Sequence, residues 1–481
     1  MAEPTLGRLL ADFAADTSWA TLPGEVAGSV RSRVLDVIGL CVAAHRLPTS
    51  TAIVEHVRDQ GGRPQAHVVG GGPAVPASLA ALANGVLAHS LDYDDTHLPS
   101  VLHPSAPVIP AALAAAELAG ASGRETIHAI AVGLEVCVRL GMAGYDPESG
   151  NSTFFEHGQH ATSICGTMGG AVAAAVLFGL SREGVLDALG VAASTASGII
   201  EANRTGGTVK RLHCGWAAQS AVTAAELVRR GFTGPPTVLE GRFGFFEAFL
   251  HGRYAPEEIT AGLGTDWAVP GIFFKPYPAN HFTHAAVDAA IGLREQGLDP
   301  SRVESLTLGV PAPVIRTIGQ PIEGKRAPET GYQAQFSGPY AVVAGLLGGG
   351  GLGVGLADFT DELARDPLRR ALMAKVDVVP DDRMTEIFPH QFPAVLRARD
   401  LDGREWSHEV LANRGGPARP LSVAELALKF RDNTEGRLSE ATAGVVTDRV
   451  NRLDELDHIG DLLRLVAEFE AEFETATRDR R

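Results

Sequence analysis

The chain has 481 residues, which is too long for one ordinary hydrophobic core, so we expect two or three domains. Hydrophobic residues make up 45% and charged residues 20%, which excludes a disordered chain, and an aromatic content of 6% favours packed helices over a β-sandwich. The formal net charge of −16 argues against a nucleic-acid-binding surface. A small anionic substrate would need a local group of cations.

The cysteines and the N-terminus indicate a protein of a reducing compartment. No CxxC pair occurs, so we predict buried free thiols and neither a zinc site nor an iron–sulfur site. No apolar signal segment opens the sequence, which favours a cytoplasmic location. The four cysteines are Cys41, Cys137, Cys165 and Cys214.

Apolar residues recur at helical spacing through the first half of the chain, which predicts successive helices. Residues 161–180 are uncharged and have the length of a membrane span. Their flanks lack basic anchors and their interior is rich in small residues, so we expect a buried helix and no membrane partner. Ser181 is predicted to cap the helix that follows. The predicted helices are residues 23–45, 76–93, 104–119, 125–140, 161–180, 183–199 and 213–230.

The pattern changes near residue 272. Residues 303–310 alternate like a strand, residues 376–381 predict a second strand, and residues 395–410 predict a hairpin that turns at Asp402 and Gly403. Helices are predicted at residues 285–296 and 339–347. The fold class is therefore mainly α, with an all-helical domain of residues 1–271 and 412–481 and a smaller α+β domain of residues 272–411.

Two glycine motifs come close to nucleotide-binding patterns and are rejected. Residues 319–326 resemble a phosphate-binding loop, but Arg326 stands where the magnesium-binding Ser or Thr belongs, and Pro321 removes a backbone amide. Gly348, Gly350 and Gly353 match GxGxxG, but the preceding segment is predicted to be a helix rather than the first strand of a βαβ unit.

The densest polar stretch is NGVLAHSLDYDDTHLPSVLHPSAPVIPAALAAAE, residues 84–117. A helix continuing from residue 76 to 93 would place His89 and Asp92 on one face, with Thr96 one turn further on. Three aspartates this close are not all comfortably ionised in a buried site, so one is expected to pair with a cation or to have a raised pKa. A solvated helix end is the competing interpretation.

Other polar groups recur where loops meet helices, which favours a site over a solvated surface. His103 directly precedes a helix, and so do His157 and His160, so that these rings lie beside N-terminal amides suited to an anion. Arg204 and Lys210 flank a glycine-containing loop. Lys275, Tyr277, His281 and His284 lie in the connector that opens the smaller domain.

These motifs resemble the MmgE/PrpD family, whose members include 2-methylcitrate dehydratases, cis-aconitate decarboxylases and iminodisuccinate epimerases. The resemblance is carried by NGxxxHxLDYDDTH, HPSxPVIPAALAxAE, GxHxTSxxGTxGxAxAAA, TVKRLHxGxAA and KPYPxxxxTHxAxDAA. It implies a large helical domain built from both chain ends, a smaller α+β lid, a site between them, a homodimer, and neither a metal nor an organic cofactor.

The resemblance also implies roles for individual residues. Asp92, Thr96, His103, His160 and Lys210 match catalytic positions of the decarboxylase-like members. One departure is Asn280, which stands where those members have His, and His281 follows it. Because of this departure, we rank decarboxylation below the other reactions. The predicted substrate-binding residues are Asp95, His157, Arg204, Lys275, Tyr277 and His281.

The function implied is a cofactor-free lyase that transfers a proton at a carbon next to a carboxylate of a small di- or tricarboxylate. A 2-methylcitrate dehydratase-like reaction is the first expectation. Epimerisation of a dicarboxylate comes second and cis-aconitate-type decarboxylation third. A noncatalytic ligand-binding dimer is the alternative from another class.

Overall fold

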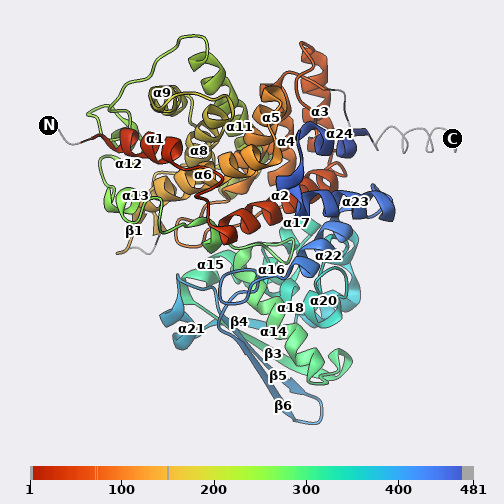
Figure 1. The fold of residues 1–481 in the computed structure, drawn as a ribbon. Coiled ribbons are helices and arrows are strands. Elements are labelled where there is room, and N and C mark those ends of the chain that lie inside the picture. The colour runs from red at the N-terminus through yellow and green to blue at the C-terminus, as the bar shows by residue number, and fades with distance from the viewer. Residues whose placement is uncertain (1–3, 71, 73, 149–150, 469–481) are drawn as a thin grey trace. The chain divides into compact units, whose positions relative to one another are not determined.

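The computed structural model describes residues 4–70, 72, 74–148 and 151–468, without the side chains of residues 203, 204 and 468. The chain divides into two compact units, one formed by residues 1–272 and 433–481 and the other by residues 273–432 (Figure 1). The first boundary lies next to the predicted one, whereas the second lies at 432/433 and not at 411/412. Leu421 and Leu426 belong to the core of the second unit, which keeps this segment there.

Among its described residues, the first unit is helical apart from one short antiparallel pair of strands. It contains α1 (Leu6–Asp16), α2 (Gly24–Ala44), α3 (Pro48–Gln60), α4 (Ala77–His89), α5 (Ser105–Ala119), α6 (Gly123–Ala143), β1 (Tyr145–Asp146), β2 (Asn151–Ser152), α7 (Thr153–Glu156), α8 (Ala161–Leu177), α9 (Arg182–Ala193), α10 (Ala202–Thr205), α11 (Val209–Val228), α12 (Phe245–Leu250), α13 (Glu257–Thr260), α23 (Glu440–Asn451) and α24 (Gly460–Glu468).

Helices α4, α5, α8 and α11 pack against one another at the centre of the first unit (Figure 1). They are rich in Ala and Gly, so their backbones can approach closely, and α8 is buried from Ala161 to Ala175. The expectation of a buried helix is thus confirmed. Ser181 caps α9 by accepting the amide of Gly184.

The length and apolar composition of α6 are also sufficient to cross a membrane. The most apolar stretch of this helix is 89% buried inside the first unit, as expected for a core helix of a folded domain.

The second unit contains a four-stranded sheet with the strand order β4-β3-β5-β6. β3 runs parallel to β4 and antiparallel to β5, and β5 and β6 form the predicted hairpin. The remaining elements are helices, with α14 and α18 packed against each other. The elements are α14 (His284–Glu295), β3 (Val303–Val310), α15 (Ile315–Ile318), α16 (Ile322–Arg326), α17 (Gly331–Ala334), α18 (Gly338–Leu347), α19 (Asp361–Arg365), α20 (Pro367–Met373), β4 (Val376–Pro380), α21 (Asp382–Ile387), β5 (Ala394–Asp400), β6 (Glu405–Val410) and α22 (Val423–Thr434).

The remaining single turns are 3-10 helices. They are Val269–Gly271 and Leu453–Glu455 in the first unit, and His281–Thr283, Pro300–Arg302, Ala312–Val314 and Leu356–Asp358 in the second. The mainly α fold class, with a small α+β unit, is confirmed.

Candidate active site

The polar stretch forms a buried loop between α4 and α5. Helix α4 ends at His89, four residues before the predicted end, and the Ser90 hydroxyl donates to the carbonyl of Val86 at 2.6 Å. Asp92 has a φ of 52°, which an α-helix cannot contain. The prediction that His89, Asp92 and Thr96 share one helix face is therefore wrong. The loop instead turns each side chain in a different direction.

Asp95 is bound inside the protein by groups from two other elements. The Arg33 guanidinium from α2 donates to its carboxylate at 2.7 Å, and both side chains are about 1% exposed. Ser105, the first residue of α5, donates its amide at 3.1 Å and its hydroxyl to the same carboxylate. These contacts anchor the loop to α5 and occupy both oxygens of Asp95. They favour a positioning role over the substrate contact predicted for this residue.

The orientation of His103 follows from the anchored loop. Its Nδ1 lies 2.7 Å from the carbonyl oxygen of Asp95 and 3.3 Å from the hydroxyl of Thr96. A carbonyl oxygen only accepts, so Nδ1 carries a proton, and in the neutral form of the ring Nε2 carries the lone pair. The amide of His103 donates to the hydroxyl of Thr162 in α8 at 3.1 Å. A ring held this way is suited to accept a proton through Nε2.

His160 caps α8 and faces His213 on α11. Their Nδ1 atoms lie 3.0 Å apart, so one ring donates and the other accepts, and at least one of them is neutral. Burial lowers the pKa of His160 well below its usual value, and positive charge on His89 and Lys210 lowers it further. Burial and the same two charges lower the pKa of His213 to about 4. Both imidazoles are therefore neutral bases near pH 7.

Lys210 lies in the first turn of α11, where the short helix α10 and two glycines lead into it. Its ammonium group is 3.4 Å from a carboxylate oxygen of Asp92, which pairs the two residues across the α4–α5 loop. The Lys210 side chain remains 19% exposed. Its charge acts on His160, which brings the Lys210–Asp92 pair into the same neighbourhood as the histidines.

Three residues missed by the sequence analysis as site members also lie here. His89 and Asp94 form a hydrogen-bonded pair whose atoms Nδ1 and Oδ2 are 2.7 Å apart, and His213 is the partner of His160. The ring of His89 lies 5.5 Å from that of His103 and 5.6 Å from that of His160. A sequence signal existed, because His89 precedes Asp92 by three residues and His213 follows Lys210 by three.

The other predicted residues of the first unit have different surroundings. His157 follows α7, donates from Nδ1 to the carbonyl of Phe249 at 3.0 Å and stacks on His251 with ring centroids 4.3 Å apart. None of its described contacts joins it to the histidines of α4 and α8. The side chain of Arg204 lies outside the described residues, so its predicted role stays a prediction.

Lys275, Tyr277 and His281 lie in the interior of the second unit. Lys275 is 1% exposed, and the Tyr277 hydroxyl donates to Asp288 at 2.5 Å and accepts from Arg414 at 3.3 Å. The ring of His281 lies 4.6 Å from that of His284. Tyr277 thus belongs to a polar network of the second unit, and its role as a substrate ligand stays a prediction.

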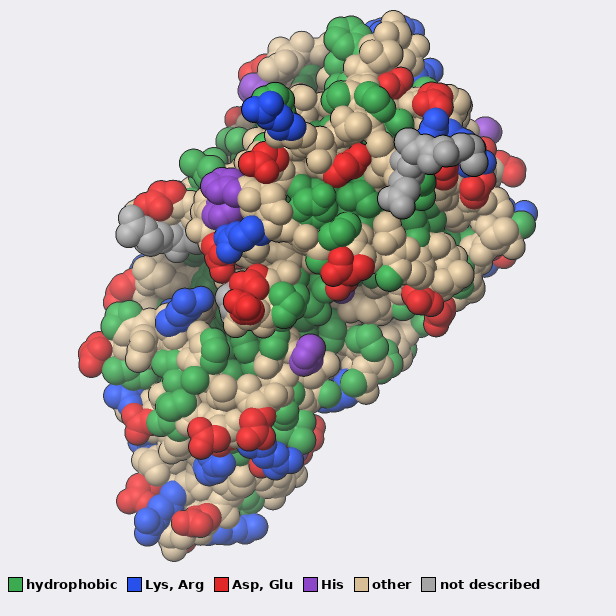
Figure 2. All heavy atoms as spheres, turned by 90° about the vertical axis from the view of Figure 1, so that its left-hand side faces the viewer, with side chains coloured by type: hydrophobic (Ala, Val, Ile, Leu, Met, Phe, Trp, Pro, Cys, Tyr) green, Lys and Arg blue, Asp and Glu red, His purple; other side chains and the backbone are tan. Residues whose placement is uncertain are grey.

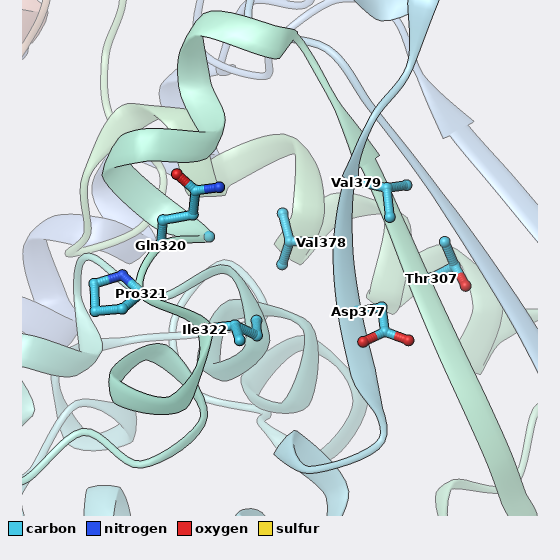
Figure 3. A pocket seen from close by; sticks show the side chains of 8 residues that line it. Thr307, Gln320, Pro321, Ile322, Asp377, Val378 and Val379 are labelled. Atoms are coloured by element: carbon cyan, nitrogen blue, oxygen red, sulfur yellow. The ribbon is translucent and has the colours of Figure 1, made fainter.

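A hollow of about 670 Å³ opens in the second unit beside the edge strand β4 (Figure 3). Gln320 and Ile322 lie on the side of β4 toward which Val378 points (Figure 3). None of the predicted site residues lines this hollow. The histidines and Lys210 gather instead at the α4–α5 loop, which is therefore the candidate site.

Charge on the surface is mixed. On the face shown in Figure 2, Lys and Arg side chains stand among Asp and Glu side chains and form no large basic patch. Within the described ranges, no group of three His, Cys, Asp or Glu side chains is arranged to hold a metal ion.

Comparison with known proteins gives consistent matches. A model of the MmgE/PrpD N-terminal domain matches residues 8–257, and a model of the MmgE/PrpD C-terminal domain matches residues 277–455. Cis-aconitate decarboxylase of Homo sapiens is 30% identical over 407 residues, covering 82% of this chain and 80% of that protein. Cis-aconitate decarboxylase of Mus musculus is 29% identical over 409 residues, covering 82% and 79%. The mitochondrial 2-methylcitrate dehydratase of Yarrowia lipolytica is 26% identical over 219 residues, covering 44% and 40%.

Proposed function

The chain belongs to the MmgE/PrpD family, and from this premise we propose that it is a lyase acting on a small tricarboxylate, with cis-aconitate as the first candidate substrate. Lyase chemistry is common to the relatives named above. The observation that carries the proposal is the group of buried, neutral histidines beside a half-buried lysine. Such a group combines a proton acceptor with a cation for a carboxylate.

In the proposed binding mode, Lys210 holds one carboxylate of the substrate. Its side chain is partly exposed, and its ammonium group pairs with Asp92. The N-terminal amides of α8, the helix that His160 caps, favour a second negative charge. The charge that develops on the substrate during reaction would then be stabilised by groups already in place.

His103 or His160 transfers the proton. In a decarboxylation, the bond from carbon to a carboxylate breaks, carbon dioxide leaves, and the electron pair stays on carbon until a histidine, which as a neutral base has taken up a proton from solvent, delivers that proton there. In a dehydration, the neutral histidine removes a proton next to a carboxylate while the hydroxyl group leaves, protonated, as water. Both reactions need one imidazole that changes its charge, and such groups typically contribute about 100- to 10,000-fold.

The relatives change the order of the candidate reactions. The cis-aconitate decarboxylases of Homo sapiens and Mus musculus each align with 82% of the chain, whereas the 2-methylcitrate dehydratase aligns with 44%. Decarboxylation therefore becomes the first candidate and dehydration the second. Asn280, which had favoured dehydration, is a single position in the connector and weighs less than the extent of these alignments.

The test supplies cis-aconitate, 2-methylcitrate, citrate and iminodisuccinate to the full chain and follows carbon dioxide release and the products by proton NMR. We expect carbon dioxide and an unsaturated dicarboxylate from cis-aconitate. In His103→Gln, the rate should fall by about 100-fold or more, because this ring is the oriented base. His56→Gln, which changes an exposed histidine of α3, should leave the rate unchanged.

Each outcome separates the candidates. Water elimination from 2-methylcitrate without carbon dioxide release from cis-aconitate would favour dehydration over decarboxylation. Binding of these acids without turnover would support a noncatalytic ligand-binding protein and contradict the lyase proposal.

A further inference from the structure

His89 and Asp94 form a closed pair behind the predicted catalytic residues. His89 is the last residue of α4 and Asp94 lies in the loop that follows. The exposed fraction of both side chains is 0%, and the distance between Nδ1 and Oδ2 is 2.7 Å. Neither side chain is exposed, so we assign neither of them a contact with the substrate. Any effect on the reaction has to act through the residues in front.

The other ring nitrogen of His89 has no described partner. Its Nε2 is buried and makes no hydrogen bond within the part of the chain that the structure describes. The rings of His103 and His160 lie 5.5 Å and 5.6 Å from the ring of His89. A structural histidine of the interior normally has both nitrogens satisfied. This one satisfies one nitrogen, and its ring lies beside the rings of His103 and His160.

We propose that His89 is a positioning residue for the proposed reaction: Asp94 holds it as a buried imidazolium, and the positive charge keeps His160 neutral and able to accept a proton. The inference rests on the proposed function, because it assigns a role in that chemistry to a residue outside the substrate's reach.

The geometry favours an ion pair over a neutral one. A buried carboxylate is costly unless it is paired with a cation and hydrogen-bonded, and Asp94 is fully buried. A distance of 2.7 Å between nitrogen and oxygen is typical of a charge-assisted hydrogen bond. With Asp94 negative and His89 positive, the pair adds no net charge to the interior but places its positive end toward the two neighbouring rings.

The positive charge of His89 acts on His160, which lies near four groups that can carry positive charge. His89 comes from α4, His103 from the loop before α5, and Lys210 and His213 from α11. Burial is the largest cause of the low pKa of His160, and the charge of His89 is the next. Because the pKa of His213 is lowered to about 4 and His103 acts here as a neutral base, His89 and Lys210 are the two cations that keep His160 deprotonated.

Asp94→Asn tests the inference with little change of shape. The amide oxygen still accepts from Nδ1, but the negative charge that holds the proton on His89 is gone. His89 then becomes neutral, the pKa of His160 rises, and the acidic limb of kcat/KM against pH moves to higher pH by about one unit. His97→Gln, which changes another buried loop histidine, should leave the limb in place.

A purely structural role predicts a different result. Damage to the loop would lower kcat without moving the acidic limb, so an unmoved limb in Asp94→Asn would overturn the proposal. A variant that fails to fold is recognised by circular dichroism, and Asp94→Glu, which keeps the charge, should then restore the wild-type limb if it folds.

A second readout is independent of turnover. In the wild-type protein without substrate, nitrogen NMR of ring-labelled histidines should show both ring nitrogens of His89 protonated near pH 7.5, identified by their loss in His89→Gln. A neutral His89 would overturn the inference even in an active enzyme. If no acid is turned over but His89 is charged, the proposed function fails while the ion pair stands.

Discussion

Three aspartates within four residues are buried because each has a separate cation. Asp92 pairs with Lys210 of α11, Asp94 with His89 of α4, and Asp95 with Arg33 of α2. Asp94 and Asp95 are neighbours in sequence, yet their partners come from different helices. Three ionised carboxylates would repel one another in the interior without these pairs. The arrangement orients the loop from three directions at once.

At the scale of residues, the sequence predicted that carboxylates, histidines and Lys210 would meet, because their motifs recur at helix starts. It did not predict which aspartate takes which partner. Asp92, with its φ of 52°, breaks the helix that was expected to align it with His89. His89 and Arg33 are partners that no periodicity indicates, since they are 5 and 62 residues away from the aspartates they bind.

The pH dependence of stability can be traced to single histidines. Burial, followed by the positive charge of Arg33, lowers the pKa of His97 to about 4, and Nδ1 of this ring lies 2.7 Å from the hydroxyl of Ser100. In the unfolded chain a histidine titrates near about 6.5. Between these pH values the unfolded state binds a proton that the folded state does not, so this ring lowers the stability as the pH falls.

We expect the thermal midpoint of His97→Gln to fall less than that of the wild type between about pH 6.5 and about pH 4. Glutamine keeps a hydrogen-bonding group and removes the titration. The measurement is a set of melting curves at several pH values, with the exposed His56→Gln as control. Identical pH dependence in wild type and His97→Gln would contradict the assignment.

At the scale of elements, a contact between glycines brings the two helices of the site together. Gly85 of α4 and Gly215 of α11 face each other, and a Cβ on Gly215 would lie 2.4 Å from the carbonyl oxygen of Leu82. α4 ends in His89, and α11 carries Lys210 and His213. The distance between these two helices therefore sets the distances among the site residues.

Gly215→Ala should force α4 and α11 apart, because the added carbon meets backbone and not a movable side chain. We expect a loss of about 1–3 kcal/mol in stability and a lower turnover. In the matched control Gly28→Ala, on α2, the added carbon meets no atom within 4 Å, so it should stabilise by about 0.5–1 kcal/mol. Equal melting temperatures for the two variants would show that the contact is not tight.

Most elements could be predicted from the sequence, since long apolar periodicity and the Asp402-Gly403 turn are local signals. The C-terminal end of α4 could not be predicted, because the apolar pattern of this helix continues past His89 into Leu91 and Tyr93. Here the buried ion pairs of the loop outweigh helix propensity, which is worth only about 0.7 kcal/mol or less for ordinary residues.

At the scale of the whole molecule, the division into two units follows the change of pattern near residue 272, while the return to the first unit near residue 433 could not be predicted. The sequence of a charged amphipathic helix such as α22 does not indicate which of the two hydrophobic cores the helix packs against. Leu426 of α22 packs in the core of the second unit, and Val446 of α23 is buried in the first.

The homodimer implied by the family resemblance stays a prediction, and α11 offers a surface for it. Val209, Leu212 and Trp216 lie at positions i, i+3 and i+7 of this helix and are 47%, 37% and 47% exposed. An exposed apolar stripe of this kind is typical of a protein interface. We propose that a second copy of the chain covers it, close to Lys210.

Trp216→Glu should then shift the protein from dimer to monomer in sedimentation experiments, because it places a charge in an apolar contact. Phe243→Glu, which changes an apolar side chain that is 86% exposed and lies outside α11, is the control and should remain a dimer. A wild-type protein that sediments as a monomer at all concentrations would contradict the proposal.

Proton transfer by the histidines of the first unit is the central claim, and hydrogen exchange in deuterium oxide tests it most directly. We expect wild-type protein to exchange protons at a carbon next to a carboxylate of at least one of the four acids, even without net conversion, and His103→Gln and His160→Gln to lose this exchange. Exchange that persists unchanged in both variants, or that is absent from the wild type with every acid, would contradict the assignment of the site.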